Sequence, residues 1–251
     1  MNKEEEKNLM NETFHYFNIA LNDFKKLLNA TDSKGNAANF AQATIAFIIT
    51  EPMAKVYAPF LEKKKNKSGR YKLATLNDEF RDISTYYSLK LFFKECFSNK
   101  RYFDLYDFLW KIYRNGLVHT YSPRKILQIP NRFIDNSALT GVHYSGSLAD
   151  LEIDYTLKQK SEAEHLKFYI HGYGKNDVPR PVFRFIPSVY YKDLFRSYIE
   201  FQDKVLKTKN IRKRFLVGAS LLGKEKRIKY SDFRRESRVL IRNELKKLVN
   251  F

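Results

Sequence analysis

The sequence has only one cysteine, Cys96, among its 251 residues. A single cysteine cannot form an internal disulfide, and its place in a periodic aromatic run predicts a buried thiol in a reducing compartment. The first residues lack the basic and apolar segments of a secretory signal, and no apolar run is long enough to span a bilayer. We therefore expect a cytoplasmic protein that does not enter a membrane.

Motifs of several enzyme classes are also missing. The histidines other than His119 do not have the Cys/His spacing of a zinc site, so we expect neither a metal nor a cofactor. His165 and His171 lie in an expected strand region, where surface or core roles are more common than metal binding. The glycines at 141–146 and 172–174 are not placed between a strand and a helix, as they are in phosphate-binding loops.

Acidic residues are scarce relative to basic ones, with 28 Asp and Glu against 46 Lys and Arg and a net charge of +18. The excess is concentrated from residue 204 onward, where 16 basic and 4 acidic residues give +12. A charge of this sign attracts polyanions, and among DNA, RNA and anionic lipid we expect nucleic acid as the partner. The alternative is a solvated basic face in a lysine-rich protein.

Apolar residues recur three and four positions apart through the first half of the chain, which predicts amphipathic helices. Short connections between them favour an up-and-down helical bundle. A charged, lysine-rich loop is expected at 62–70. The four helices are predicted at about 2–29, from about 37 to Glu51 with Pro52 kinking or ending it, at 75–98 with Thr75 as N-cap, and around 103–117.

Beyond Pro123 the pattern changes to short segments rich in β-branched and aromatic residues. The segments at 150–157, 165–173 and 182–186 predict a small antiparallel sheet inserted between bundle helices. Ser188 is then expected to cap the next bundle helix. The fold is thus predicted to be mainly α, with a bundle at 1–123, a β-containing insertion at 124–187, a bundle helix at 188–209 and a basic helical C-terminal extension at 210–251.

The basic extension is expected to bind nucleic acid. It starts with Arg212-Lys213-Arg214, continues with an apolar patch broken by Gly218 and Gly223, and ends in a helix in which Leu240 and other apolar residues dock. Basic residues spaced by four in that helix form a ridge that can follow a phosphate backbone. An ordinary solvated helix face explains the same spacing equally well. The ridge consists of Arg234, Arg238, Arg242 and Lys246.

The segment from Arg114 to His119 contains several side chains that can bind a phosphate or transfer a proton. The planar guanidinium of Arg114 matches phosphate oxygens, and His119 can accept and donate a proton near neutral pH. Asn115 can hold either partner through neutral hydrogen bonds. In an ideal helix Arg114 and His119 diverge by roughly 140°, so they converge only if the helix is distorted, which Gly116 permits, or if a second copy supplies the missing side.

These residue types suit the cleavage of RNA by attack of the ribose 2′-OH on the adjacent phosphorus, which leaves a 2′,3′-cyclic phosphate and needs no metal. The reaction requires one group to accept a proton and another to donate one. Because the motif contains a single histidine, we expect a homodimer in which two motifs face each other. Glu51, an acidic residue on an otherwise apolar helix, either supports this site or serves as a solvent-facing or capping residue.

The same residues resemble the Arg-x4-His motif, with Asn after the Arg, of the higher eukaryotes and prokaryotes nucleotide-binding (HEPN) superfamily. The resemblance covers roughly the first 120 residues and the helix after the insertion. It implies a dimeric, metal-independent endoribonuclease, commonly a toxin of a toxin–antitoxin, abortive-infection or other antiviral defence system. Arg114 and His119 would be its catalytic pair and Asn115 their polar companion.

The continuation of the motif to Tyr121 is similar to toxins of two-gene HEPN modules, in which a partner nucleotidyltransferase modifies this Tyr with adenylate. The sheet insertion, the basic extension and the length of this chain are not features of those compact toxins. Two other functions fit the residues. One is a non-catalytic nucleic-acid-binding or scaffold module of the same fold, and the other is a DNA-binding protein in which the Arg and His only pack and cap a helix.

Overall fold

Helices make up most of the described part of the chain. The computed structural model describes residues 1–29, 39–65, 71–115, 126–127, 137–142, 165–171, 180–225, 234–235 and 237–242. Its helices are α1 (Lys3–Leu28), α2 (Asn39–Tyr57), α3 (Thr85–Cys96), α4 (Arg101–Asp104), α5 (Tyr106–Phe108), α9 (Pro187–Lys207) and α10 (Lys209–Glu225), with the 3₁₀ turn η1 (Phe80–Asp82) and the π-helical turn η2 (Leu109–Arg114). The mainly α class predicted from the sequence is confirmed.

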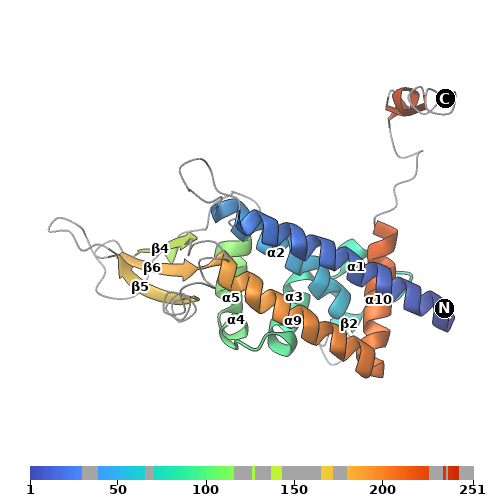
Figure 1. Ribbon diagram of the computed structural model, residues 1–251, viewed down its shortest axis with the longest axis horizontal. Helices are drawn as coiled ribbons and strands as arrows, with labels where there is room; N and C mark the ends of the chain where they lie inside the picture. The colour runs from blue at the N-terminus through green and yellow to red at the C-terminus, as the bar shows by residue number, and fades with distance from the viewer. Residues whose placement is uncertain are drawn as a thin grey trace.

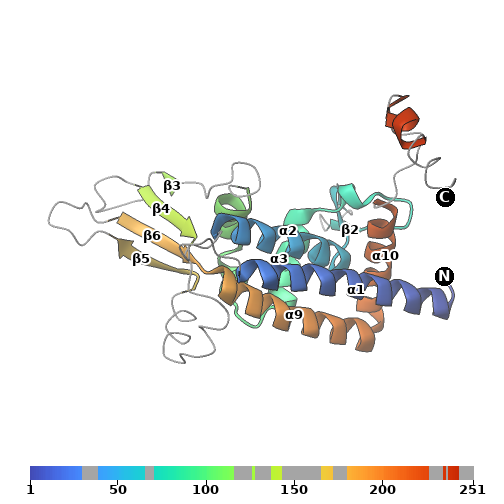
Figure 2. The same cartoon turned by 45° about the horizontal axis from the view of Figure 1, so that its top comes forward.

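The long helices pack side by side. Figures 1 and 2 show α1, α2 and α9 along the long axis of the molecule, with α10 crossing them near the N-terminus and a four-stranded sheet at the opposite end. Helix α1 has the predicted bounds, because the Asn2 side chain accepts hydrogen bonds from the backbone N–H groups of Glu4 and Glu5 at 3.0 and 2.9 Å. Helix α9 begins at Pro187, one residue before the predicted cap at Ser188.

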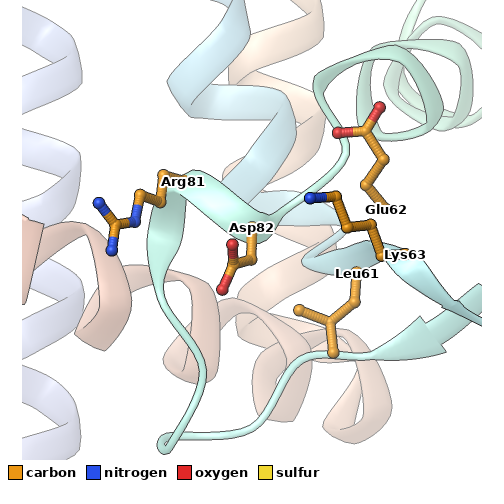
Figure 3. Close-up of a pocket in the computed structure, with 5 residues that line it drawn as sticks. All are labelled: Leu61, Glu62, Lys63, Arg81 and Asp82. Carbon is orange, nitrogen blue, oxygen red and sulfur yellow. The ribbon is translucent and has the colours of Figure 1, made fainter.

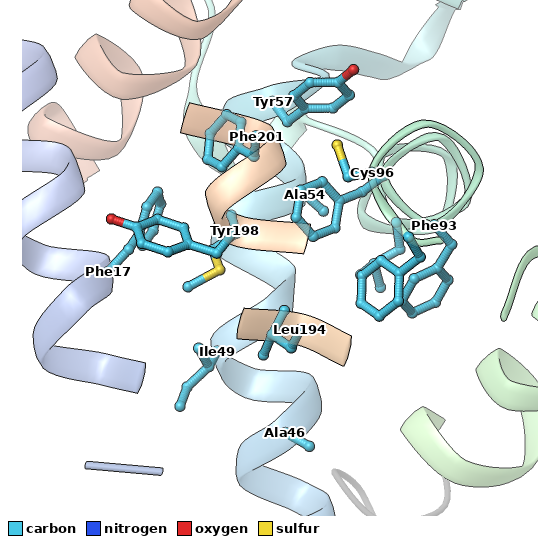
Figure 4. Packing of buried hydrophobic residues seen from close by; sticks show 14 of the residues in the cluster. Phe17, Ala46, Ile49, Ala54, Tyr57, Phe93, Cys96, Leu194, Tyr198 and Phe201 are labelled. Carbon is cyan, nitrogen blue, oxygen red and sulfur yellow. The ribbon is translucent and has the colours of Figure 1, made fainter. Parts of the chain in front are cut away.

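An aromatic core joins these helices. Figure 4 shows Tyr57 of α2 near Phe201 of α9, and their rings meet edge to face with centroids 5.5 Å apart. Phe201 also lies 5.7 Å from Phe215 of α10. The buried Tyr198 hydroxyl donates a hydrogen bond of 2.9 Å to the backbone carbonyl of Phe14 in α1. The predicted apolar stripe of α9 is therefore the face that binds α1, α2 and α10.

Of the two effects expected of Pro52, kinking or ending helix α2 near Glu51, the second is wrong. The helix continues through Pro52 to Tyr57. Proline removes the backbone N–H that would bond to the Ile48 carbonyl. The Ile48 side chain is 48% exposed, so this turn of the helix faces solvent, where water can satisfy that carbonyl. Tertiary packing of the surrounding apolar residues holds the helix together across the missing bond.

The third helix begins later than predicted. Thr75 does not cap a helix: its backbone N–H and its hydroxyl both donate to the Asp78 carboxylate, at 2.9 and 2.8 Å, which closes a turn instead. The helix starts at Thr85, where the Ser84 side chain accepts a hydrogen bond from the Tyr87 N–H. It ends at Cys96, which is buried as predicted and whose pKa burial raises to about 12.

Residues 62–65 of the charged loop predicted at 62–70 form a strand instead, and residues 66–70 lie outside the described part of the chain. Strand β1 (Phe60–Lys65) pairs antiparallel with β2 (Tyr71–Leu73), with Phe60 opposite Leu73. Leu61, which the sequence analysis left out of the loop, is 2% exposed and anchors the hairpin in a small apolar cluster. Lysine content alone therefore misled the prediction, because the strand takes its stability from the apolar residue before the charges.

The segments predicted at 165–173 and 182–186 form the expected antiparallel pair, but the sheet to which they belong is mixed. Its strand order is β3 (Ile126–Leu127), β4 (Ser137–Val142), β6 (Arg180–Phe185) and β5 (Lys167–His171). Strands β4 and β6 are parallel, and the other pairs are antiparallel. A parallel pair requires a long crossover, which the chain between β4 and β6 supplies. The strand predicted at 150–157 lies outside the described residues.

A buried polar network joins the sheet end to the helices. The ring of His165, which is 2% exposed, accepts a hydrogen bond on Nδ1 from the Ile186 N–H at 2.9 Å. Its Nε2–H must then donate to the Tyr102 hydroxyl at 2.8 Å, and that hydroxyl donates to Asp193 at 2.9 Å. Burial lowers the pKa of His165 to about 3. The core role expected for this histidine is confirmed.

The stability of the protein should therefore fall in mild acid. His165 stays neutral in the folded state, whereas the unfolded chain binds a proton below its ordinary pKa of 6.5. The stabilisation is thus complete above pH 6.5 and is lost as the pH falls toward 3. We expect the free energy of unfolding in urea to be about 2 kcal/mol lower at pH 5 than at pH 7.5 from this group.

The variant His165→Gln should be less stable at neutral pH, and it should lose this part of the pH dependence. The exposed His15 gives a matched control, since His15→Gln should keep the pH dependence of the parent chain. An unchanged acid destabilisation in His165→Gln would show that other groups cause it.

The apolar patch expected around Gly218 and Gly223 lies within the continuous helix α10. A Cβ atom added at Gly218 would lie 2.7 Å from both Cα and O of Val56, whereas one added at Gly223 would meet nothing within 4 Å. Gly218 therefore lets α10 approach the backbone of α2 closely. The buried Phe215 and Ala219 place α10 in the same core as the other helices.

These two glycines make a matched pair for a stability measurement. Gly218→Ala should lower the free energy of unfolding by about 1–3 kcal/mol, because the helices must separate to admit the methyl group. Gly223→Ala should instead leave the stability unchanged or raise it by up to about 1 kcal/mol, as alanine favours helix. Equal effects of the two changes in urea titrations would contradict the close contact.

Of the apolar residues expected to dock the last helix, Leu240 is exposed, whereas Ile241 is half-buried. Residues 235 and 237–242 are helical, but Val239 and Leu240 are 51% and 66% exposed. Figures 1 and 2 show this turn apart from the bundle, which explains the exposure of Leu240. Phe233, Leu245 and Leu248, which were also expected to dock, lie outside the described residues.

Candidate functional site

The predicted motif begins at the end of a π-helical turn. Arg114 is the last residue of η2, and the backbone N–H of Asn115 bonds to the Trp110 carbonyl, five residues earlier. A π turn widens the helix locally and is frequent at functional sites. The predicted fourth helix is thus divided into α4, α5 and η2. The sequence argument offered either a distorted helix or a second copy as the way in which Arg114 and His119 converge. The distortion that the structure describes lies before Arg114, and residues 116–119 lie outside the described residues.

Arg114 is fixed by its neighbours. Its Nε donates to Oε1 of Glu51 at 2.5 Å, and its Nη2 donates to Oε2 of the same carboxylate at 3.1 Å. Its Nη1 donates to Oδ1 of Asn115 at 3.1 Å, and the guanidinium lies over the Trp110 ring, 4.8 Å from the centroid. Two parallel bonds to one carboxylate give a strong and directional pair. We call Glu51, Trp110, Arg114 and Asn115 the Arg114 cluster.

The Arg114 cluster is partly buried. The side chains of Arg114 and Glu51 are each 17% exposed, which leaves one part of the cluster in contact with solvent. Glu51 comes from the middle of α2, 63 residues away in sequence, so the pair also ties η2 to the bundle. Of the two roles considered for Glu51, the geometry matches the one in which it supports Arg114.

The aromatic surroundings hold η2 in place. The Trp110 and Tyr86 rings meet edge to face at 5.5 Å, and the Tyr106 ring meets Tyr86 at 4.8 Å. The Tyr86 hydroxyl donates to Asp107, which raises the pKa of Tyr86 to about 12, and the Tyr106 hydroxyl donates to the Tyr86 carbonyl. These contacts connect η2 to α3, so Arg114 is positioned from two helices.

Three of the predicted site residues cannot be placed. His119 and Tyr121 lie outside the described residues, and so does Lys246 of the basic ridge. Of the motif residues, the structure therefore describes Arg114 and Asn115. That the side chains of Arg114 and His119 converge stays a prediction.

The basic segment at the start of α10 is largely engaged within the fold. Arg212 donates to the Val205 carbonyl at 3.1 Å and also to the Leu206 carbonyl, which caps the end of α9. Arg214 lies over the Tyr57 ring at 5.2 Å and 3.7 Å from Glu95. Lys213 is exposed, as are Arg234 and Arg242, whereas Arg238 is half-buried. Only part of the predicted basic surface is thus presented to solvent.

Lys55 is a residue near the site that the sequence analysis missed. It follows Glu51 by one helical turn, is 9% exposed, and its Nζ lies 4.5 Å from the centroid of the Phe80 ring. Burial lowers its pKa, and the nearby Glu51 carboxylate opposes that effect. Glu51 and Lys55 are the only charged residues between Asn39 and Tyr57, so their spacing on an apolar helix was a usable signal.

A cavity of about 310 Å³ lies between β1 and η1 (Figure 3). Leu61, Glu62, Lys63, Arg81 and Asp82 line it. None of these residues was predicted to be functional. The two basic and two acidic side chains give the cavity mixed charge, which does not favour one class of ligand. The Glu62 carboxylate also raises the pKa of the Lys55 ammonium group, against the effect of burial.

Other classes of site are absent from the part of the chain that the structure describes. No group of three or more His, Cys, Asp or Glu side chains could hold a metal ion there. None of the helices in that part is long and apolar enough to cross a membrane. Comparison with protein-family models, curated proteins and solved structures finds no match to this chain.

The ion pair between Glu51 and Arg114 should contribute strongly to stability. Removing one member of a partly buried pair leaves the other charge without compensation, so Glu51→Ala should lower the free energy of unfolding by about 3 kcal/mol. Asp203 provides the control, since its 2.6 Å pair with Lys207 is exposed and Asp203→Ala should change stability by less than about 1 kcal/mol. Urea titrations of both variants test this, and similar losses would contradict it.

Proposed function

We propose that this protein is a metal-independent endoribonuclease of HEPN type. The observation that carries the proposal is the Arg114 cluster, in which Glu51 and Asn115 fix the guanidinium at the start of the Arg-x4-His motif. An arginine fixed in this way needs little reorganisation when a phosphate approaches, and preorganised charge is the most effective kind in catalysis. The net charge of +18 adds a general attraction for RNA.

In the proposed reaction, the ribose 2′-oxygen attacks the adjacent phosphorus. A bond forms between the 2′-oxygen and phosphorus, the bond to the 5′-oxygen breaks, and the products are a 2′,3′-cyclic phosphate and a 5′-hydroxyl. His119 accepts the 2′-OH proton, and Arg114 stabilises the negative charge that develops on the phosphate oxygens. Asn115 orients Arg114 through their hydrogen bond. The 5′-oxygen needs a separate proton donor, and a homodimer would supply it as the histidine of a second copy.

The biological setting follows from the family that the motif resembles. We propose a toxin or antiviral defence effector in the cytoplasm, restrained by an antitoxin until it is released. Tyr121 is the residue that a partner nucleotidyltransferase would modify, since an adenylate there would add a negative charge next to the proposed RNA site.

The proposal is tested by incubating the purified protein with RNA in EDTA and analysing the new ends. We expect cleavage with 2′,3′-cyclic phosphate ends, and we expect His119→Ala to lower the rate by about 100-fold or more through loss of proton transfer. Arg114→Ala should lower it as well. His15→Ala, at an exposed histidine of α1, is the matched control and should cleave like the parent.

Two outcomes would count against this function. Cleavage that persists in His119→Ala, or that EDTA abolishes, would indicate a contaminant or a different mechanism. RNA binding that depends on Arg114 without any cleavage would favour the alternative, a non-catalytic nucleic-acid-binding module.

A further inference from the structure

Helix α3 presents a row of one tyrosine and two lysines on its outer side. Tyr86, Lys90 and Lys94 follow one another at intervals of four residues, so they lie on one face of the helix. Phe92 and Phe93 on the other side are buried in the core. Lys94 is exposed, and Tyr86 and Lys90 are half-buried. We call Tyr86, Lys90 and Lys94 the α3 ridge.

Aromatic rings surround the two ammonium groups of the α3 ridge. Lys90 Nζ lies 6.0 Å from the centroid of the Tyr86 ring and 5.9 Å from that of the Phe103 ring in α4. Lys94 Nζ lies 5.7 Å from the same Phe103 centroid. Within the part of the chain that the structure describes, neither lysine forms an ion pair with a carboxylate. Both positive charges are therefore available to an anion from solution.

Short distances connect the α3 ridge to the Arg114 cluster. The Tyr86 ring meets the Trp110 ring of η2 edge to face, with centroids 5.5 Å apart. The Arg114 guanidinium in turn lies 4.8 Å from the Trp110 centroid. Each step from Lys94 through Phe103 and the ridge to Arg114 is thus 6.0 Å or less. A strand bound on the ridge would continue toward the proposed site.

Positive charge predominates on this side of the molecule. The segment 85–115, which forms α3, α4, α5 and η2, has six basic and three acidic residues, and with Glu51 the net charge is +2. Glu51 is bonded to Arg114, and Glu95 turns away from the ridge to accept a hydrogen bond from a tyrosine of α2. Asp107 is the carboxylate beside the ridge, where it accepts a hydrogen bond from the Tyr86 hydroxyl. The two ridge lysines remain uncompensated.

This surface differs from the one that the sequence predicted. Arg212 and Arg214 in the basic extension are engaged by carbonyls, a ring and a carboxylate of the fold itself. Lys90 and Lys94 contact rings only, and they lie next to the Arg114 cluster. The α3 ridge is therefore better placed than the start of α10 to hold RNA at the proposed site.

We propose that single-stranded RNA binds along the α3 ridge, with its phosphates on Lys90 and Lys94 and a base against Phe103. The inference rests on the proposed function. Rings beside cations bind single strands, because the bases stack on the rings while the cations contact the backbone. From Tyr86 to Lys94 the helix rises by about 12 Å, the length of about three stacked bases. A duplex keeps its bases paired, so it cannot place one on Phe103.

The lysines are tested by binding to a short 2′-O-methyl oligouridine, which cannot be cleaved, at several salt concentrations. The double variant Lys90→Gln/Lys94→Gln should weaken the Kd about tenfold while circular dichroism shows an intact helical fold. The slope of log Kd against log salt concentration should fall by about 1.4, because each phosphate contact of a single strand contributes about 0.7. Lys3→Gln/Lys7→Gln removes the same charge from two exposed lysines at the same spacing on α1, and should bind like the parent.

The aromatic contact is tested by comparing single-stranded with duplex 2′-O-methyl RNA. Phe103→Leu keeps an apolar side chain against the core but removes the ring, so it should weaken single-strand binding about tenfold and leave duplex binding unchanged. Phe195→Leu in α9 is the matched control, since that ring is 44% exposed and lies on another helix. An equal loss for single strand and duplex in Phe103→Leu would overturn the preference for single strands.

Comparison with cleavage separates this inference from the proposed function. If the parent cleaves RNA through His119 while the Lys90→Gln/Lys94→Gln variant binds and cleaves like it, the α3 ridge is overturned and the function stands. If binding depends on the ridge lysines but the parent never cleaves, the enzyme function fails and the ridge stands. Equal weakening by the α1 control variant would indicate attraction to net charge alone and overturn the ridge. A parent that neither binds nor cleaves overturns both.

Discussion

The burial of α2 is the constraint on which the rest of the structure depends. Gly218 brings α10 against the backbone of Val56 on one side, and α1, α3 and α9 pack on the others. A helix enclosed in this way must satisfy each polar group that it carries. Gln42 donates to the Leu27 carbonyl of α1, and Thr50 shares a hydrogen bond of 2.7 Å with Tyr190 of α9. Gln42 and Thr50 therefore hold two different neighbours, α1 and α9, against α2.

Glu51 belongs to the same set of constraints. Its bidentate bond to Arg114 fixes η2 against the bundle, and the aromatic contacts of Trp110 and Tyr86 fix it against α3. One ion pair thus has a structural role and, in the proposed function, a chemical one. The two roles are compatible because a rigid guanidinium is useful both for packing and for phosphate binding.

Helix periodicity in the sequence predicted those parts of the fold that depend on interactions between residues near each other in the chain. The stripe and the approximate bounds of α1 follow from helix periodicity, and both are present. Pro52 was expected to kink or end its helix because of its intrinsic preference, yet packing lets α2 continue through it to Tyr57. The start of α3 was misplaced because Thr75 and Asp78 can close a turn as readily as they begin a helix.

The candidate site was predictable only in part. The sequence singled out Arg114 and Asn115 from their neighbours, and it named Glu51 without assigning its role. The contact between Glu51 and Arg114 joins residues 63 positions apart, and no local rule encodes such a distance. Lys55 was missed because a single lysine on a helix is normally read as solvent-exposed, whereas the bundle encloses this one.

The bond between Tyr198 and Phe14 spans 184 residues, and it has a consequence for how the molecule assembles. Helices α1 and α2 complete their core only with α9 and α10, which the ribosome makes much later. Contacts so distant along the chain make folding slow, because a large loop must close before they form. The face of α2 that α9 and α10 later cover stays open to other molecules during synthesis. A chaperone or an inhibitory partner would have its best opportunity to bind in that interval.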